Sequence, residues 1–141
     1  MQTRRWVNQS QPQTLVIATF LLYFVAFWAV LGNSTNLGVA VDGHKLGGSL
    51  FYGDFGLQVD RVSRLFMVVG SIGAGYLISN EKKIGYNLGL AVAALPLIAD
   101  VLLIVRYQYF GMDLVALLFD IALFALLLHT QSRSYVRLWF K

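Results

Sequence analysis

Long apolar runs alternate with short polar segments along the chain, and this pattern predicts membrane-spanning helices. A span needs about 20 mainly apolar residues. Within the second run, strong apolarity starts only at Leu65, so we expect its helix to begin near Leu57 or Val59 and to pass through the headgroup region. Pro96 inside the third run is expected to kink that helix without ending it. The four predicted spans cover residues 14–32, 59–79, 84–107 and 112–129.

The predicted fold class is therefore an all-α membrane protein, a bundle of four transmembrane helices in a single domain. Arg4 and Arg5 precede the first run, as basic residues do in a signal peptide. That run is longer than the usual apolar h-region of a signal peptide and ends in Leu31-Gly32-Asn33-Ser34 without a small-x-small cleavage site, which favours a retained span. One bundle accounts for the whole length of 141 residues.

The long connection between the first two spans, residues 33–58, combines repeated glycines with alternating apolar residues. Such alternation is typical of a short strand, and Asp42-Gly43 is suited to a two-residue hairpin turn. We expect a hairpin or an irregular extracytoplasmic cap packed on the bundle. A re-entrant segment, or one that lies on the membrane surface, is the alternative.

The distribution of lysine and arginine predicts the orientation of the bundle, because these residues are in excess on the cytoplasmic side. Four spans place both termini on one side. That side carries seven basic residues against four on the other, so we expect both termini in the cytoplasm. Short loops and a compact chain are typical of the bacterial cytoplasmic membrane. The two sets are Arg4, Arg5, Lys82, Lys83, Arg133, Arg137 and Lys141 against Lys45, Arg61, Arg64 and Arg106.

Composition narrows the chemistry further. Hydrophobic residues make up 57% of the chain and charged residues 13%, roughly half the charged share of a soluble domain. The absence of cysteine excludes disulfides and thiolate chemistry. Two histidines, His44 and His129, do not make a metal site, and no nucleophile elbow, phosphate loop or zinc motif is present. We expect no enzymatic activity, no metal and no cofactor.

The most informative residues are Asp100 and Asp120, which lie inside two apolar runs. If the chain reverses near Phe110, each carboxylate lies ten residues from the turn, at a depth of about 15 Å. Ionisable residues at mid-bilayer usually face a protein interior or a partner. The pair is predicted either to dock a partner or pin the hairpin, or to hold a proton or cation.

Arg106 and Asp113 lie on either side of the same turn. They are predicted to form an ion pair at the membrane interface, or simply to mark the water boundary. Asp113 and Asp120 are seven residues apart and share a helix face. That face is expected to look toward the bundle or toward another subunit.

Small residues four apart predict close helix packing between the second and third spans, or dimerisation through them. His129, just before the basic tail, is expected to cap the end of the last span. The tail, residues 130–141, mixes arginines with aromatic residues and is predicted to lie on anionic lipid through Arg133, Tyr135, Arg137 and Trp139. The packing residues are Gly70, Ala74, Ser71, Gly75, Gly85, Gly89 and Ala93.

These features favour a small non-catalytic integral subunit that stabilises, anchors or assembles a larger membrane complex. Its expected partners are membrane lipids and other integral subunits; a hetero-complex is favoured, and a homo-oligomer is the alternative. The net charge of +4 does not indicate nucleic-acid binding, because the basic residues sit at span ends rather than in one patch. The alternative is an oligomeric transporter component that conducts protons or cations past Asp100 and Asp120. A weaker alternative is a membrane enzyme that uses carboxylates on a lipid substrate.

Overall fold

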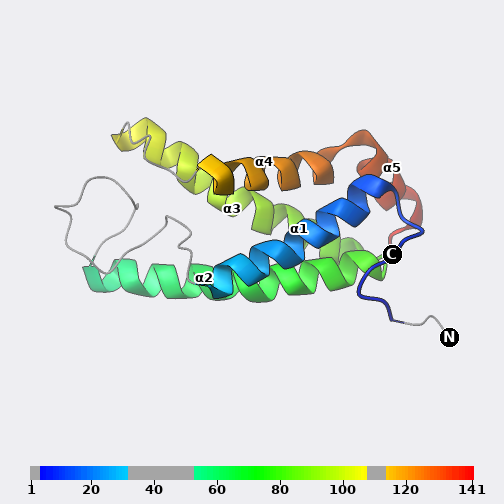
Figure 1. The fold of residues 1–141 in the computed structure, drawn as a ribbon, viewed down its shortest axis with the longest axis horizontal. Coiled ribbons are helices and arrows are strands. Elements are labelled where there is room, and N and C mark those ends of the chain that lie inside the picture. Colours follow the sequence, from blue (N-terminus) through cyan, green and yellow to red (C-terminus); the bar gives the residue numbers. More distant parts are fainter. Residues whose placement is uncertain (1–3, 32–52, 108–113) are drawn as a thin grey trace.

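A computed structural model describes residues 4–31, 53–107 and 114–141, and all regular structure in these ranges is α-helical (Figure 1). The apolar runs predicted as spans all form helices. The helix over the second run begins at Gly53, several residues before the expected start. The predicted hairpin lies outside the described residues. The helices are α1 (Gln13–Val30), α2 (Gly53–Ser79), α3 (Lys83–Tyr107), α4 (Leu114–Leu128) and α5 (Thr130–Trp139).

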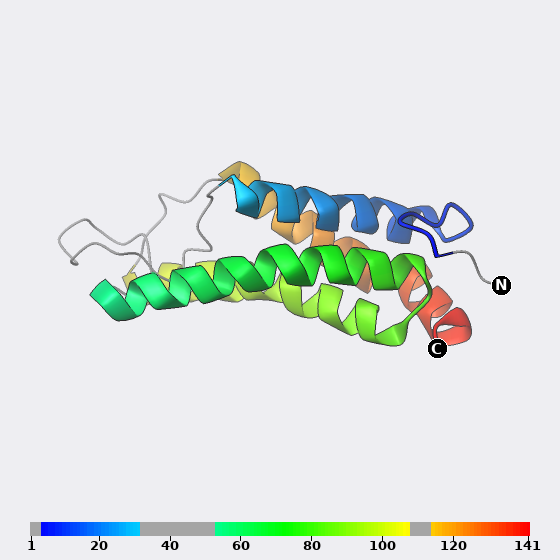
Figure 2. The same cartoon turned by 90° about the horizontal axis from the view of Figure 1, so that it is seen from below.

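The first four helices form a bundle in which α1 and α3 each pack against both α2 and α4. The short helix α5 contacts α4 and α1 and lies at the end of the bundle that also holds both chain termini (Figures 1 and 2). Each of the four helices contributes fully buried apolar side chains to one continuous core. The largest of these are Leu15, Leu22, Ile78, Val92, Leu123 and Leu127.

Within the described ranges, three helices are long and apolar enough to cross a membrane: α1, α2 and the segment Lys83–Leu102 of α3. They are compatible with integration into a membrane. Pro96 is buried within α3, which continues past it. The apolar helix α4 has 15 residues, so it extends about 22 Å, less than the roughly 30 Å of a hydrocarbon core.

Glycines bring the backbones of α2 and α3 close together near their connecting turn. A Cβ atom on Gly85 would contact Leu77 Cβ and would lie 2.8 Å from the backbone nitrogen of Ile78. Farther along, a Cβ atom on Gly70 would lie 2.9 Å from a methyl carbon of Val92. No larger residue fits at Gly85 without displacing backbone, so this glycine sets the separation of the two helices.

The turn between α2 and α3 is a Schellman motif with Glu81 in the left-handed conformation, at φ 59°. The amide of Lys82 donates to Leu77 O and the amide of Glu81 donates to Ile78 O, each at 2.9 Å. Glycine usually occupies this position, because a side chain there costs about 1–2 kcal/mol. The Glu81 carboxylate oxygen Oε1 accepts hydrogen bonds from Tyr135 and Asn8, which oppose this cost.

Both ends of the chain are fastened to this turn. On the N-terminal side, the amide of Arg5 donates to Asn80 Oδ1 at 3.1 Å, and Asn80 Nδ2 donates back to Arg5 O at 2.9 Å. On the C-terminal side, the amide of Lys83 donates to Lys141 O and the amide of Lys141 donates to Glu81 O, both at 3.0 Å. The turn therefore joins the N-terminal segment, the α2–α3 hairpin and the segment after α5.

The residues of the basic tail form helix α5, and His129 begins it rather than ending α4. The His129 side chain accepts a hydrogen bond from the amide of Gln131, as an N-cap does. The expectation that His129 caps the preceding helix was wrong, because the chain bends there and a new helix starts. Ser132 Oγ donates to Leu126 O at 2.7 Å and Tyr86 OH donates to Leu127 O at 2.6 Å, which satisfies two carbonyls at the end of α4.

Candidate intramembrane carboxylate site

The packing of α2 on α3 places Asp60 and Asp100 at about the same height in the bundle. Gly70 of α2 lies opposite Leu88 and Val92 of α3. The two helices are antiparallel, so residues about ten positions from this contact, toward the open end of the hairpin, lie at one height. Those residues are Asp60 on α2 and Asp100 on α3.

Both side chains belong to the buried faces of their helices. Asp60 is 8% exposed and continues the buried row of Ser63, Met67 and Gly70 on α2. Asp100 is 5% exposed and follows Ala99, which is also buried, on α3. Burial of this degree is rare for aspartate unless the carboxylate is protonated, hydrogen-bonded or paired.

Asp120 of α4 lies within electrostatic range of Asp100. The contact between Gly89 of α3 and Leu127 of α4 sets the register of these two helices. In that register Asp120 lies about one helical turn, roughly 5 Å, closer to α5 than Asp100 does. Asp120 is half-buried, whereas the adjacent apolar residues Phe119 and Ile121 are exposed.

Asp60 forms an ion pair with Arg64, one turn farther along α2, with 2.7 Å between Oδ2 and the guanidinium. The second carboxylate oxygen of Asp60 and the Nε atom of Arg64 are buried and have no hydrogen-bond partner among the described residues. The pair therefore brings one carboxylate and one guanidinium to the height of Asp100. One atom of each group can still form a further hydrogen bond. An additional polar group or water could be held there.

Asp60 was not among the site residues predicted from the sequence, because the polar segment around it was assigned to the headgroup region. The available signal was the four-residue spacing of Asp60 and Arg64, which on a helix predicts an ion pair. The burial of Asp60 against the neighbouring helices was not indicated by the apolar pattern. Asp113 and the side chain of Arg106 lie outside the described residues.

The other residues selected from sequence lie in two places. The small residues of α2 and α3 face neighbouring helices; Gly75, for example, faces the ring of Tyr23 on α1, where a Cβ atom would lie 2.7 Å from a ring carbon. The tail residues lie on α5, where Arg133, Arg137 and Trp139 are exposed and Tyr135 is half-buried.

Chemically, the arrangement offers carboxyl groups and one guanidinium within an otherwise apolar bundle. Within the described ranges, no group of three histidine, cysteine, aspartate or glutamate side chains is placed to hold a metal ion. The carboxyl groups can bind protons, accept hydrogen bonds or pair with a cationic group. Comparisons with protein-family models, with curated proteins and with solved structures found no match to this chain.

Proposed function

We propose that this protein is a non-catalytic integral membrane subunit that stabilises, anchors or assembles a larger membrane complex. The observation that carries the proposal is the half-buried Asp120 on α4, bordered by the exposed apolar side chains of Phe119 and Ile121. A charged aspartate at mid-bilayer costs about 3 kcal/mol on insertion scales. A basic or hydrogen-bonding group on a neighbouring subunit would offset that cost and would favour docking at this face.

The proposal includes four spans, the fourth of which is the run predicted from the sequence over residues 112–129. An even number of spans returns the chain to its starting side, in keeping with the position of both termini at one end of the bundle (Figure 1). The basic residues near that end favour a cytoplasmic location for it. Bacterial cytoplasmic membrane is the proposed location.

The test is purification from the native membrane in a mild detergent, followed by native mass spectrometry. An accessory subunit co-purifies with larger proteins in constant ratio, and Asp120→Asn lowers that recovery. The matched control is Asp54→Asn, which removes an exposed carboxylate from the first turn of α2. Recovery of a homo-oligomer alone, or equal loss of partners in both variants, would contradict the proposal.

A second candidate function is conduction of protons or cations, and the electrostatic interaction of Asp100 with Asp120 favours it. Asp60, at the height of Asp100, would add a third carboxyl to such a path. In reconstituted liposomes a conducting protein shows flux that Asp100→Asn or Asp120→Asn abolishes while assembly is preserved. Absence of flux in the wild-type oligomer would exclude this function.

A further inference from the structure

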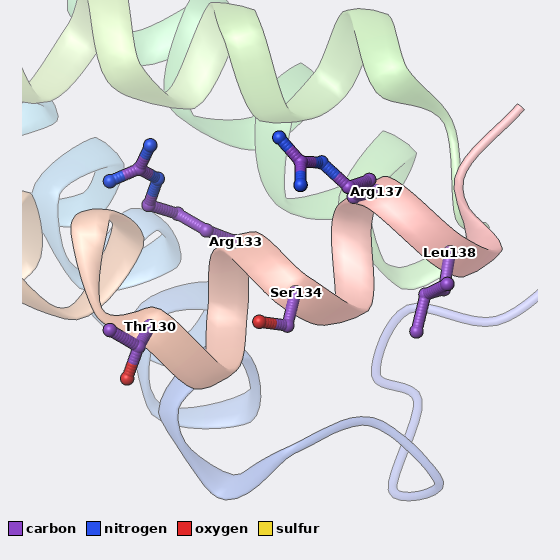
Figure 3. Close-up of a pocket in the computed structure, with 5 residues that line it drawn as sticks. All are labelled: Thr130, Arg133, Ser134, Arg137 and Leu138. Carbon is purple, nitrogen blue, oxygen red and sulfur yellow. The ribbon is translucent and has the colours of Figure 1, made fainter.

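A cavity of about 390 Å³ lies against the outer side of α5. Its lining combines two arginines, two hydroxyl side chains and one exposed leucine: Arg133, Arg137, Ser134, Thr130 and Leu138. Figure 3 shows the side chains of Arg133 and Arg137 leaving α5 on the same side of the helix. The four-residue spacing of the two arginines stacks them on one helix face.

The positive charge of this cavity is not neutralised within the described part of the chain. The one ion pair found there joins Asp60 to Arg64, on a different helix. Arg133 is within electrostatic range of Tyr86, but a tyrosine hydroxyl is neutral at physiological pH. Glu81, the acidic residue of the α2–α3 turn, already accepts hydrogen bonds from the side chains of Tyr135 and Asn8.

The surrounding surface strengthens the positive potential. Lys82, Lys83 and Lys141 belong to the same end of the bundle, through the hydrogen-bonded turn between α2 and α3. A cavity with two guanidinium groups and no ion-pair partner in the described part of the chain favours an anion. Guanidinium groups bind phosphate oxygens in a bidentate manner, and hydroxyl groups supply further hydrogen-bond donors.

The apolar side chains of α5 indicate that the phosphate belongs to a lipid and not to a soluble ion. Leu138, which lines the cavity, is 77% exposed, and the neighbouring Trp139 is 60% exposed. Exposed leucine and tryptophan beside arginines are typical of a helix at the boundary between headgroups and acyl chains. A soluble phosphate ion would gain nothing from these apolar side chains, whereas a lipid contacts them with its glycerol and acyl groups.

We propose that Arg133 and Arg137, with Thr130 and Ser134, form a discrete binding site for the phosphate of an anionic phospholipid headgroup. This site is more specific than a general attraction of the tail to anionic lipid. It requires the membrane location that α1 to α3 favour, and it is independent of the partner subunit proposed above.

The experiment measures lipid binding to the purified, delipidated chain by native mass spectrometry, with phosphatidylglycerol and phosphatidylcholine added separately. We expect the wild type to bind phosphatidylglycerol about tenfold more tightly than phosphatidylcholine. The double variant Arg133→Gln/Arg137→Gln is expected to lose about tenfold of this affinity. The variant Arg133→Lys/Arg137→Lys keeps the charge but lacks the bidentate geometry, so we expect it to lose part of the affinity for phosphatidylglycerol.

The matched control is Arg4→Gln/Arg5→Gln, which removes two charges from the same end of the bundle. The hydrogen bonds of Arg5 with Asn80 use its backbone atoms, so this control preserves them. If the site is discrete, we expect the control to lose less than threefold of its affinity for phosphatidylglycerol. Equal loss in both glutamine variants would overturn a discrete site in favour of diffuse charge, and competition by inorganic phosphate at the lipid's own concentration would overturn a lipid source. Unchanged unfolding temperatures of the variants confirm that they are folded.

Discussion

The hydroxyl of Tyr135 on α5 donates a 2.8 Å hydrogen bond to the carboxylate of Glu81 in the turn between α2 and α3. These residues are separated by two complete helices in the sequence. Their contact, together with the backbone hydrogen bonds of Lys141, fixes α5 across one end of the bundle. The orientation of the arginine cavity on α5 therefore depends on the α2–α3 turn.

Replacement of Tyr135 by phenylalanine is expected to lower the free energy of unfolding by about 1–2 kcal/mol, because it removes a hydrogen bond to a charged group. Thermal or denaturant unfolding in detergent measures the change. The control is Tyr76→Phe, since the Tyr76 hydroxyl has no hydrogen-bond partner among the described residues. Equal destabilisation by both variants would argue against a specific role for the bond between Tyr135 and Glu81.

The stability that the Tyr135–Glu81 hydrogen bond contributes is expected to depend on pH. Burial, then the hydrogen bond and charge of Glu81, raise the pKa of Tyr135 above its usual value of 10.0. A raised folded-state pKa contributes stability that is complete below about pH 10 and is lost as pH rises through the folded value. The stability advantage of the wild type over Tyr135→Phe should therefore shrink above about pH 10. An advantage that grows with pH in this range would contradict the assignment.

Gly85→Ala is expected to destabilise the α2–α3 hairpin by about 2 kcal/mol or more. Its new methyl group would meet Leu77 Cβ and the backbone of Ile78, which cannot move aside as a flexible side chain can. Gly73→Ala is the control, because its Cβ atom would contact one methyl carbon of Leu88 at 3.7 Å. We expect Gly73→Ala to be neutral or slightly stabilising, since alanine favours helix over glycine. Comparable unfolding temperatures for the two variants would show that the hairpin is not closely packed at Gly85.

A double-mutant cycle on Asp60 and Arg64 tests whether their ion pair is part of the bundle interior. Asp60→Leu alone is expected to cost about 1–3 kcal/mol, because it leaves a partly buried guanidinium without its counter-charge, and Arg64→Met alone leaves the buried carboxylate unpaired. The double variant Asp60→Leu/Arg64→Met should recover most of this loss. Coupling near zero, measured from unfolding free energies, would place the pair in solvent rather than in the bundle.

The absence of cysteine makes the chain suitable for topology mapping with single-cysteine variants. Ser134→Cys on α5 and Asp54→Cys at the start of α2 lie at opposite ends of the bundle, and both positions are exposed. If the termini are cytoplasmic, a membrane-impermeant maleimide should label Asp54→Cys in intact cells and Ser134→Cys only after lysis. The reverse pattern would overturn the orientation, and labelling of both in intact cells would overturn an even number of spans.

The sequence alone determined the helical class and predicted helices long and apolar enough to cross a membrane, three of which are present in the described part of the chain. The physical reason is that a segment in lipid must satisfy its backbone polar groups internally, as an α-helix does. It also indicated that α2 and α3 pack closely or dimerise, since small residues four apart allow two helix backbones to approach. Asp100 and Asp120 were predicted as site residues because placing a carboxylate in an apolar run costs free energy. These inferences depend on local composition and spacing.

Tertiary structure decided the features that depend on residues distant in the sequence. Helix register placed Asp60 at the height of Asp100, a relationship that no local pattern in α2 contains. The bend at His129 turned the basic tail into a separate helix, because Tyr86 and Ser132 satisfy the last carbonyls of α4. The position of α5 depends on hydrogen bonds to Glu81 across more than fifty residues. Such contacts are set by how the helices pack, and only packing reveals them.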